Sequence, residues 1–249
     1  GTVAEVLQVE QPDHALSTAA ARQFAASWQR LRQERPASAA PELRTLPWPL
    51  DPIEPPSLAE AASAPATAAS TAAAAKPARV VALWLPTAAV QALAARWPQG
   101  WPGASQVLLS AQLSDPQQLQ LPPAWQRQVR WASLHADPVR QRAGRAMVMS
   151  SWLKRIGLAE SPEVAQAEAY AAVFYLGDAM ARMRLSWSGE HLLEQLEYSV
   201  NNRPAGAAYY SLSLGPNQRI AAKSGRMLGY AEPGAAEPVP IGPLIRPED

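Results

Sequence analysis

Short apolar runs alternate with amphipathic segments along most of the chain, and this alternation predicts strands followed by helices. Val3 to Val9 predicts a strand whose apolar residues are Val3, Val6, Leu7 and Val9. Arg79 to Leu85 is a nearly continuous apolar run, as expected of a buried parallel strand. Gln106 to Leu109 and Val129 to Leu134 repeat the pattern. The repetition of strand and helix is typical of an α/β domain with a mainly parallel, doubly wound sheet.

The first helix is predicted after Val3 to Val9. Phe24, Trp28 and Leu31 recur at i, i+4 and i+7, and Ser17 or Thr18 is a candidate N-cap. Leu43 to Leu50 predicts a further short strand, which Pro47 and Pro49 push to a sheet edge or into an extended loop.

The second half of the chain predicts three more helices. Asp137-Pro138 is a cap signature for a helix that Gly157 ends, and Ser161 to about Arg184 is the longest helix. His191 to Val200 predicts the last one. Tyr170 lies inside the longest helix, where we expect a core residue with an anchored hydroxyl rather than a ligand contact.

Two segments depart from this alternation. Residues 51–78 are rich in Ala, Pro, Ser and Thr, and they offer too little apolar area to offset the entropy of ordering. We expect a solvated insertion there, with a partner-binding arm as the alternative.

Near the end, the polar and apolar residues of 209–214 alternate, Gly215-Pro216-Asn217-Gln218 predicts a turn, and Ile220 to Tyr230 predicts a return strand weakened by glycine.

The segment YYSLSLGPNQRIAAKSG, residues 209–225, resembles the tail of type I periplasmic substrate-binding proteins, the branched-chain amino-acid and amide receptors of ABC transporters. It is most similar to a divergent subgroup associated with c-type cytochromes. Residues 79–232 follow the order of elements in that subgroup, and residues 3–50 follow it more loosely. Where the family has an ordinary helix and loop, this chain has the insertion at residues 51–78.

The resemblance implies a fold and a location. Family members contain two α/β lobes joined by three crossing strands, with the solute between them. We expect this chain to correspond to the C-terminal lobe, with an N-terminal lobe missing upstream, a periplasmic location, and a C-terminal β-hairpin extension. The predicted divisions are a first strand–helix–strand unit (1–50), the insertion (51–78), the rest of the lobe (79–200), and the hairpin with the tail (201–249).

Composition excludes several functional classes. The net charge of +1 gives no nucleic-acid footprint, and the absence of Cys excludes thiolate catalysis, disulfides and a CxxCH haem attachment on this chain. Scattered histidines give no metal-ligand spacing, and no cofactor motif occurs, so we expect neither a metal nor a cofactor. No apolar run is long enough for a membrane span, and no signal peptide opens the sequence, which we expect to extend upstream.

Candidate binding residues follow the predicted strands, because ligands of open parallel sheets bind beyond the carboxyl ends of the strands. Thr87 lies at a predicted helix N-terminus, which is a ready carboxylate site. In the absence of an opposing lobe, we favour the structural alternative. In it, these side chains are ordinary helix caps and polar residues of loops. The candidates are Trp84, Thr87, Ser110, Gln112, His135 and Asp137.

Three functions compete. The first is solute binding for an ABC permease, with a small organic solute such as an amino acid or amide. The second is a docking or scaffold module for a periplasmic c-type cytochrome or quinoprotein dehydrogenase system. The third is a hydrolase built on Ser110, His135 and Asp137, which we reject because no Gly-flanked nucleophile turn surrounds Ser110 and His135 is too close to Asp137 in sequence. We therefore predict a protein that is not an enzyme.

Overall fold

The computed structural model describes residues 3–34, 41–49, 78–135, 149–161, 164–183, 187–203, 209–210, 212–215 and 221–246. Its strands are β1 (Val3–Glu10), β2 (Leu43–Pro47), β3 (Ala78–Trp84), β4 (Gln106–Ser110), β5 (Val129–Ser133), β6 (Gly225–Gly229) and β7 (Val239–Ile245). Its helices are α1 (Ala15–Glu34), α2 (Thr87–Arg96), α3 (Pro123–Gln128), α5 (Ser150–Ile156), α6 (Val164–Arg182) and α7 (Gly189–Asn202).

The strands form one seven-stranded sheet in the order β2-β1-β3-β4-β5-β6-β7. The pairs β1–β2, β1–β3, β3–β4 and β4–β5 are all parallel. The predicted class, an α/β fold with a mainly parallel sheet, is confirmed. Proline-rich β2 lies at one edge of the sheet, as its sequence predicts.

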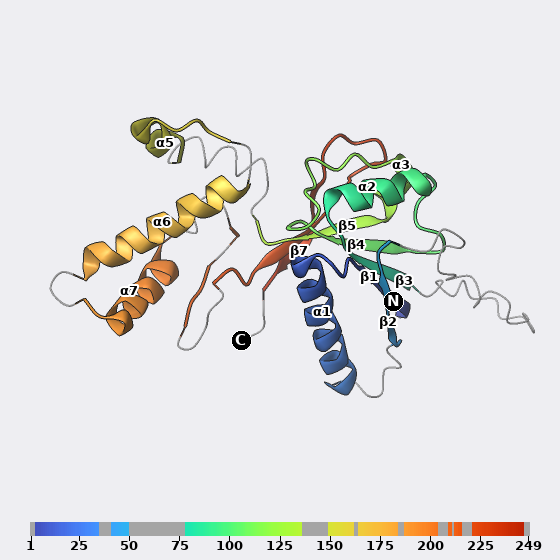
Figure 1. The fold of residues 1–249 in the computed structure, drawn as a ribbon, viewed down its shortest axis with the longest axis horizontal. Helices are drawn as coiled ribbons and strands as arrows, with labels where there is room; N and C mark the ends of the chain where they lie inside the picture. Colours follow the sequence, from blue (N-terminus) through green and yellow to red (C-terminus); the bar gives the residue numbers. More distant parts are fainter. Residues whose placement is uncertain are drawn as a thin grey trace, which may run out of the picture. The chain divides into compact units, whose positions relative to one another are not determined.

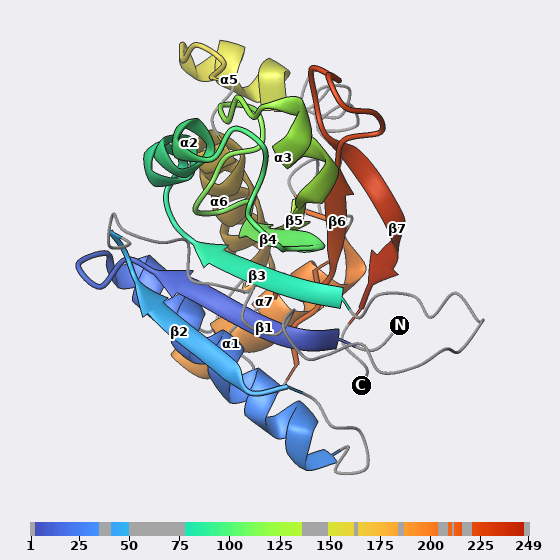
Figure 2. The same cartoon turned by 90° about the vertical axis from the view of Figure 1, so that its right-hand side faces the viewer.

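The strand order explains where the helices lie. From β1 the chain passes to β2 on one side, whereas β3, β4 and β5 follow one another on the other side. Because parallel crossovers are right-handed, a change of direction along the sheet puts the helices on opposite faces. Figure 2 shows α1 on one face of these strands and α2 and α3 on the other. The sheet is therefore doubly wound, and its order reverses between β1 and β3.

The chain divides into two compact units. The first contains residues 1–132 and 228–239, and the second contains residues 133–227 and 240–249. The chain thus changes unit at three places, inside β5, β6 and β7, which are neighbours in the sheet order. The four divisions predicted from the sequence remain a prediction.

The main hydrophobic cluster of the first unit lies on one face of the parallel strands. Val81 and Leu83 of β3, and Val107 and Leu109 of β4, are alternate residues that share this face, and they are 0–1% exposed. Trp125 is fully buried, and its indole nitrogen donates a hydrogen bond of 2.6 Å to the carbonyl oxygen of Trp97. Such burial of large aromatic side chains makes this layer rigid enough to position the loops at its edge.

The second unit is mainly helical in the part of the chain that the structure describes. Helices α6 and α7 pack against each other (Figure 1). Their core contains Met149, Leu153, Ala167, Ala171, Tyr175 and Val200. Gly157 ends α5 in a left-handed conformation with φ of 75°, as predicted. Ser188 caps α7 by accepting a hydrogen bond from the His191 nitrogen, so this helix begins at Gly189, two residues before the predicted start at His191.

The C-terminal segment forms antiparallel pairing, with a bridge between Leu212 and Ala222. Its return strand is β6, which lies between β5 and β7 in the main sheet and is therefore not only a peripheral extension. Strand β7 was not predicted. Pro122 and Pro123 lie at the start of α3, where Pro122 is the N-cap residue and Pro123 takes the first helical position, to which proline is well suited.

Several predicted features lie outside the described residues, among them nearly all of the 51–78 insertion and the helix start at Asp137-Pro138. Within the described residues, no helix combines the length and apolar character that crossing a membrane requires.

Candidate functional site

The reversal of strand order between β1 and β3 marks the candidate site, because ligands of doubly wound sheets bind at the carboxyl ends of the strands where the order reverses. Glu10 ends β1 and Trp84 ends β3, and the two residues are partners in the strand register. Along the same edge, Thr87 begins α2 shortly after β3, Ser110 ends β4, and Gln112 lies in the loop after β4. Four of the six predicted site residues therefore lie at this edge of the first unit.

Trp84 is held by polar groups of the protein itself. Its indole nitrogen donates a hydrogen bond of 3.0 Å to Gln8 Oε1, and its carbonyl oxygen accepts one from the Ser17 hydroxyl. The ring of Phe24 lies 5.4 Å from the indole, between centroids. The predicted N-cap role of Ser17 is wrong, because Ser17 lies inside α1, where it ties the first turn of that helix to the end of β3.

Thr87 is the first residue of α2, and Pro86 occupies the N-cap position. The Thr87 hydroxyl accepts a hydrogen bond of 3.2 Å from the backbone nitrogen of Asp115. Nearby, the buried Ser114 hydroxyl donates one of 2.7 Å to the carbonyl oxygen of Leu85. Both bonds fasten the loop after β4 to the start of α2, so the Thr87 hydroxyl has a structural role. The Ala89 and Val90 nitrogens both donate to the Pro86 carbonyl oxygen, and the amides of Thr87 and Ala88, which have no partner among the described residues, keep the affinity of a helix N-terminus for anions.

Ser110 and Gln112 differ in what they offer to a ligand. The Ser110 hydroxyl accepts a hydrogen bond of 3.3 Å from the Gln112 nitrogen, which stabilises the turn after β4. The side chain of Gln112 is exposed. An amide side chain supplies both donors and an acceptor, and Gln112 is consequently the predicted residue best placed to contact a solute.

Glu10 is a residue that the sequence analysis missed. Its Oε2 atom is buried and has no hydrogen-bond partner within the described part of the chain. A buried carboxylate oxygen without a donor is costly and requires an explanation. The available signal was an acidic residue at the end of the first strand, immediately before the Gln11-Pro12 break.

His135 belongs to a separate cluster in the second unit. It is 8% exposed, and its Nε2 lies 3.5 Å from Glu168 Oε1. The Tyr209 hydroxyl donates a hydrogen bond of 3.3 Å to the same oxygen, and the His135 and Tyr209 rings lie 5.2 Å apart. Burial, followed by the charge and hydrogen bond of Glu168, raises the pKa of Tyr209 to about 12.

The last candidate, Asp137, lies outside the described residues. The structure gives the proposed hydrolase residues different partners. Ser110 is engaged by Gln112, whereas His135 faces Glu168 and Tyr209. Among the described residues, no group of three or more His, Asp or Glu side chains is arranged to hold a metal ion.

No family model matches the sequence, and a search of curated proteins gives no match. Solved structures do match. One, from Rhodospirillum rubrum, is assigned as a branched-chain amino acid ABC transporter protein, with a TM-score of 0.59, 17% identity, and coverage of 96% of this chain and 61% of that one. Another is an ABC transporter substrate-binding protein from Aeropyrum pernix, with a TM-score of 0.59, 15% identity, and coverage of 98% and 60%.

These likenesses show the fold. The chain has the type I periplasmic-binding-protein fold, seen in substrate-binding proteins of ABC transporters, and it spans about three fifths of the length of the two structures it matches.

Proposed function

We propose that this protein is a non-enzymatic solute-binding protein of an ABC-type uptake system, working in the periplasm with a small organic solute such as an amino acid or amide. The observation that carries the proposal is the agreement over 96% and 98% of the chain with two proteins of ABC transport systems. Fold alone does not specify function, so the argument also needs the chemistry of the candidate site.

The places where the chain passes between the two units support a binding protein with two lobes. The chain changes unit within three adjacent strands, and three crossing strands are what the family resemblance implies between two lobes. This pattern favours a shortened protein that has two lobes. The alternative is the expectation from the sequence, in which the chain is the C-terminal lobe alone.

The site chemistry suits a zwitterionic solute. At the reversal of strand order, one carboxylate oxygen of Glu10 has no partner among the residues that the structure describes, and the first turn of α2 presents backbone amides. A carboxylate recognises an ammonium group, and a helix N-terminus recognises a carboxylate. Gln112 adds a polar contact for side-chain selection. These three features together favour an amino acid over an uncharged solute.

A thermal-shift screen of the full chain with amino acids, amides and small organic acids tests the proposal. A solute present at a hundred times its dissociation constant stabilises the folded state by about 2.7 kcal/mol and raises the melting temperature by several degrees. Glu10→Gln and Gln112→Ala should each reduce the shift, whereas Arg30→Gln, on the exposed part of α1, should leave it unchanged. A complete screen without any stabilising solute would count against solute binding.

The second candidate function is docking of a periplasmic c-type cytochrome or dehydrogenase. The specific observation in its favour is that Trp84, Thr87 and Ser110 are already engaged within the protein, which leaves few free polar groups for a solute. Co-purification of a haem protein with the tagged chain, together with a negative solute screen, would favour docking over transport.

A further inference from the structure

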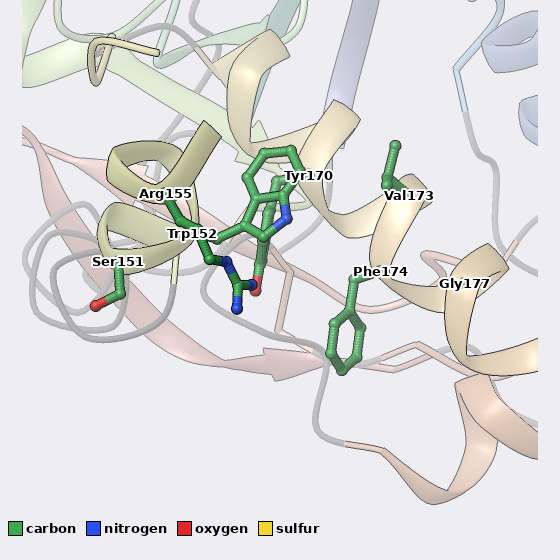
Figure 3. Close-up of a pocket in the computed structure, with 7 residues that line it drawn as sticks. All are labelled: Ser151, Trp152, Arg155, Tyr170, Val173, Phe174 and Gly177. Carbon is green, nitrogen blue, oxygen red and sulfur yellow. The ribbon is translucent and has the colours of Figure 1, made fainter. Parts of the chain in front are cut away.

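A pocket of about 510 Å³ lies within the second unit, between α5 and α6, apart from every residue discussed above except Tyr170. Its size is within the range of small-molecule sites, about 300–1,000 Å³. Figure 3 shows the side chains of Trp152, Arg155 and Tyr170 gathered between the two helices, with Phe174 further along α6. The lining residues are Ser151, Trp152, Arg155, Tyr170, Val173, Phe174 and Gly177.

Helical periodicity builds this pocket from two stripes of residues. Tyr170, Val173, Phe174 and Gly177 are separated by three or four positions, so they share one face of α6. Residues 151, 152 and 155 likewise share one face of α5. Because the helices carry the lining residues, the pocket is shaped by regular backbone rather than by loops.

The wall of the pocket is aromatic. The rings of Trp152 and Tyr170 meet edge to face, with centroids 5.3 Å apart, and the Tyr170 and Phe174 rings lie 6.2 Å apart at an angle of 28°. Phe174 is 41% exposed and Val173 is 55% exposed. Exposed aromatic surface around a concave site favours a flat apolar group, which binds by stacking and by edge-to-face contacts.

The only charged side chain among the lining residues is that of Arg155. Arg155 makes no ion pair with any described residue, so its guanidinium has donors available for a ligand. A guanidinium matches the geometry of a carboxylate, to which it donates two parallel hydrogen bonds. The combination of an aromatic wall with one available cation selects for an aromatic ring that carries a negative charge.

We propose that this pocket is a binding site for small aromatic carboxylates. Trp152, Tyr170 and Phe174 contact the ring, and Arg155 pairs with the carboxylate. The site lies within a single unit, and it does not depend on the solute-binding proposal. The core role predicted for Tyr170 is therefore incomplete, because its ring also lines a cavity that is open to ligands.

Gly177 provides a way to close the pocket without disturbing the helix. A Cβ atom added there meets no atom within 4 Å, and leucine has a higher helix propensity than glycine. Gly177→Leu should consequently fill the cavity while α6 is kept. Gly189→Leu is a matched control, since Gly189 in α7 also faces open space.

Titration calorimetry of the full chain with naphthoate, and with naphthamide as its uncharged analogue, tests the proposal. We expect saturable binding of naphthoate, which Arg155→Gln weakens about tenfold while binding of naphthamide stays unchanged. Gly177→Leu should abolish binding of both probes, and Gly189→Leu should not affect either. If the melting temperature of Gly177→Leu shows that the fold is destabilised, Phe174→Ala replaces it. This variant should weaken the binding of both probes.

Three outcomes would overturn the proposal. They are the absence of saturable naphthoate binding, equal affinity of wild type and Arg155→Gln for naphthoate, and undiminished binding in Gly177→Leu. Dimerisation that Gly177→Leu abolishes, without naphthoate binding, would assign this face to a second copy of the chain instead. A solute found in the thermal screen whose effect survives Gly177→Leu belongs to the other site, so the two proposals fail separately.

Discussion

The hydroxyl of Thr87 accepts a hydrogen bond from the backbone nitrogen of Asp115 at 3.2 Å, and this bond joins the start of α2 to the loop after β4. Thr87 is also the residue that the sequence nominates for carboxylate recognition. The structure separates the two roles, because the hydroxyl serves the fold and only the backbone amides of the helix remain for an anion. A substitution of the Thr87 side chain should therefore affect the stability of the fold before it affects the binding of a carboxylate.

Thr87→Val removes the acceptor while nearly preserving the shape of the side chain. We expect the free energy of unfolding to fall by about 1 kcal/mol, since the Asp115 amide loses its partner. Thr87→Ser keeps the hydroxyl and should stay within about 0.5 kcal/mol of wild type. Urea unfolding at neutral pH measures both. An unchanged unfolding free energy in Thr87→Val would show that the bond contributes nothing to stability.

Gly225→Ala tests why a glycine stands in β6. A Cβ atom there would lie 3.0 Å from the carbonyl oxygen of Ser133, a backbone atom that cannot move independently of β5. We expect a loss of about 1–3 kcal/mol in the free energy of unfolding, as for other overpacked sites. Gly189→Ala, where the added methyl group meets open space, should cause no comparable loss and is the control.

The same contact shows where sequence analysis is limited. Gly225 weakens the predicted return strand, yet it is the residue that allows β6 to approach β5, and this approach depends on a segment ninety positions away in the sequence. Strand β7 was missed for a related reason. Pro240 and Pro243 argue against a strand, but β7 lies at the sheet edge, where missing donors are tolerated. Gly242, within β7, has a φ of 74°, a left-handed conformation that glycine adopts readily.

The apolar runs of β1, β3, β4 and β5 were predictable from the apolar residues of the sequence, although burial along β4 and β5 alternates, so that one face of these strands is buried more deeply than the other. From these runs the edge of the sheet that carries Trp84, Thr87, Ser110 and Gln112 follows directly. Their hydrogen-bond partners do not follow, since Gln8 and Asp115 reach them only in the folded chain. Likewise, the sequence marks Glu10 as an acidic strand end, but its local pattern does not predict that one carboxylate oxygen is buried with no partner in the described part of the chain.

Asp178 in α6 connects this helix to α7 and to the residue after it. Its carboxylate accepts hydrogen bonds from the Ser199 hydroxyl, from Arg182 Nε at 3.1 Å and from Arg203 at 3.0 Å. The Ser199 bond first, and then those of the arginines, lower the pKa of Asp178 below its usual value of 3.8 against the opposing effect of burial.

The folded state therefore favours ionised Asp178, which contributes stability above the usual pKa of 3.8. This contribution is lost as the pH falls through the lower folded-state pKa. Asp178→Asn should reduce the unfolding free energy at neutral pH by on the order of 1 kcal/mol, because part of the network is exposed. The difference from wild type should shrink in acid, and urea unfolding across the acidic range measures it. Arg203→Gln, which removes one exposed partner, should have a smaller effect.

Tyr209 gives the opposite pH dependence. Its pKa is raised to about 12, first by burial and then by the charge and hydrogen bond of Glu168. The folded state therefore favours the neutral phenol, and the resulting stability is complete below the ordinary tyrosine pKa of 10.0 and is lost as the pH rises through about 12.

Ultraviolet titration of tyrosinate should show a late-ionising tyrosine in wild type that is missing in Tyr209→Phe. In Glu168→Gln the charge is gone but the burial remains, so the pKa of Tyr209 should fall only part of the way toward 10.0. A Tyr209 that ionises with the exposed tyrosines in wild type would contradict its packing against His135 and Glu168.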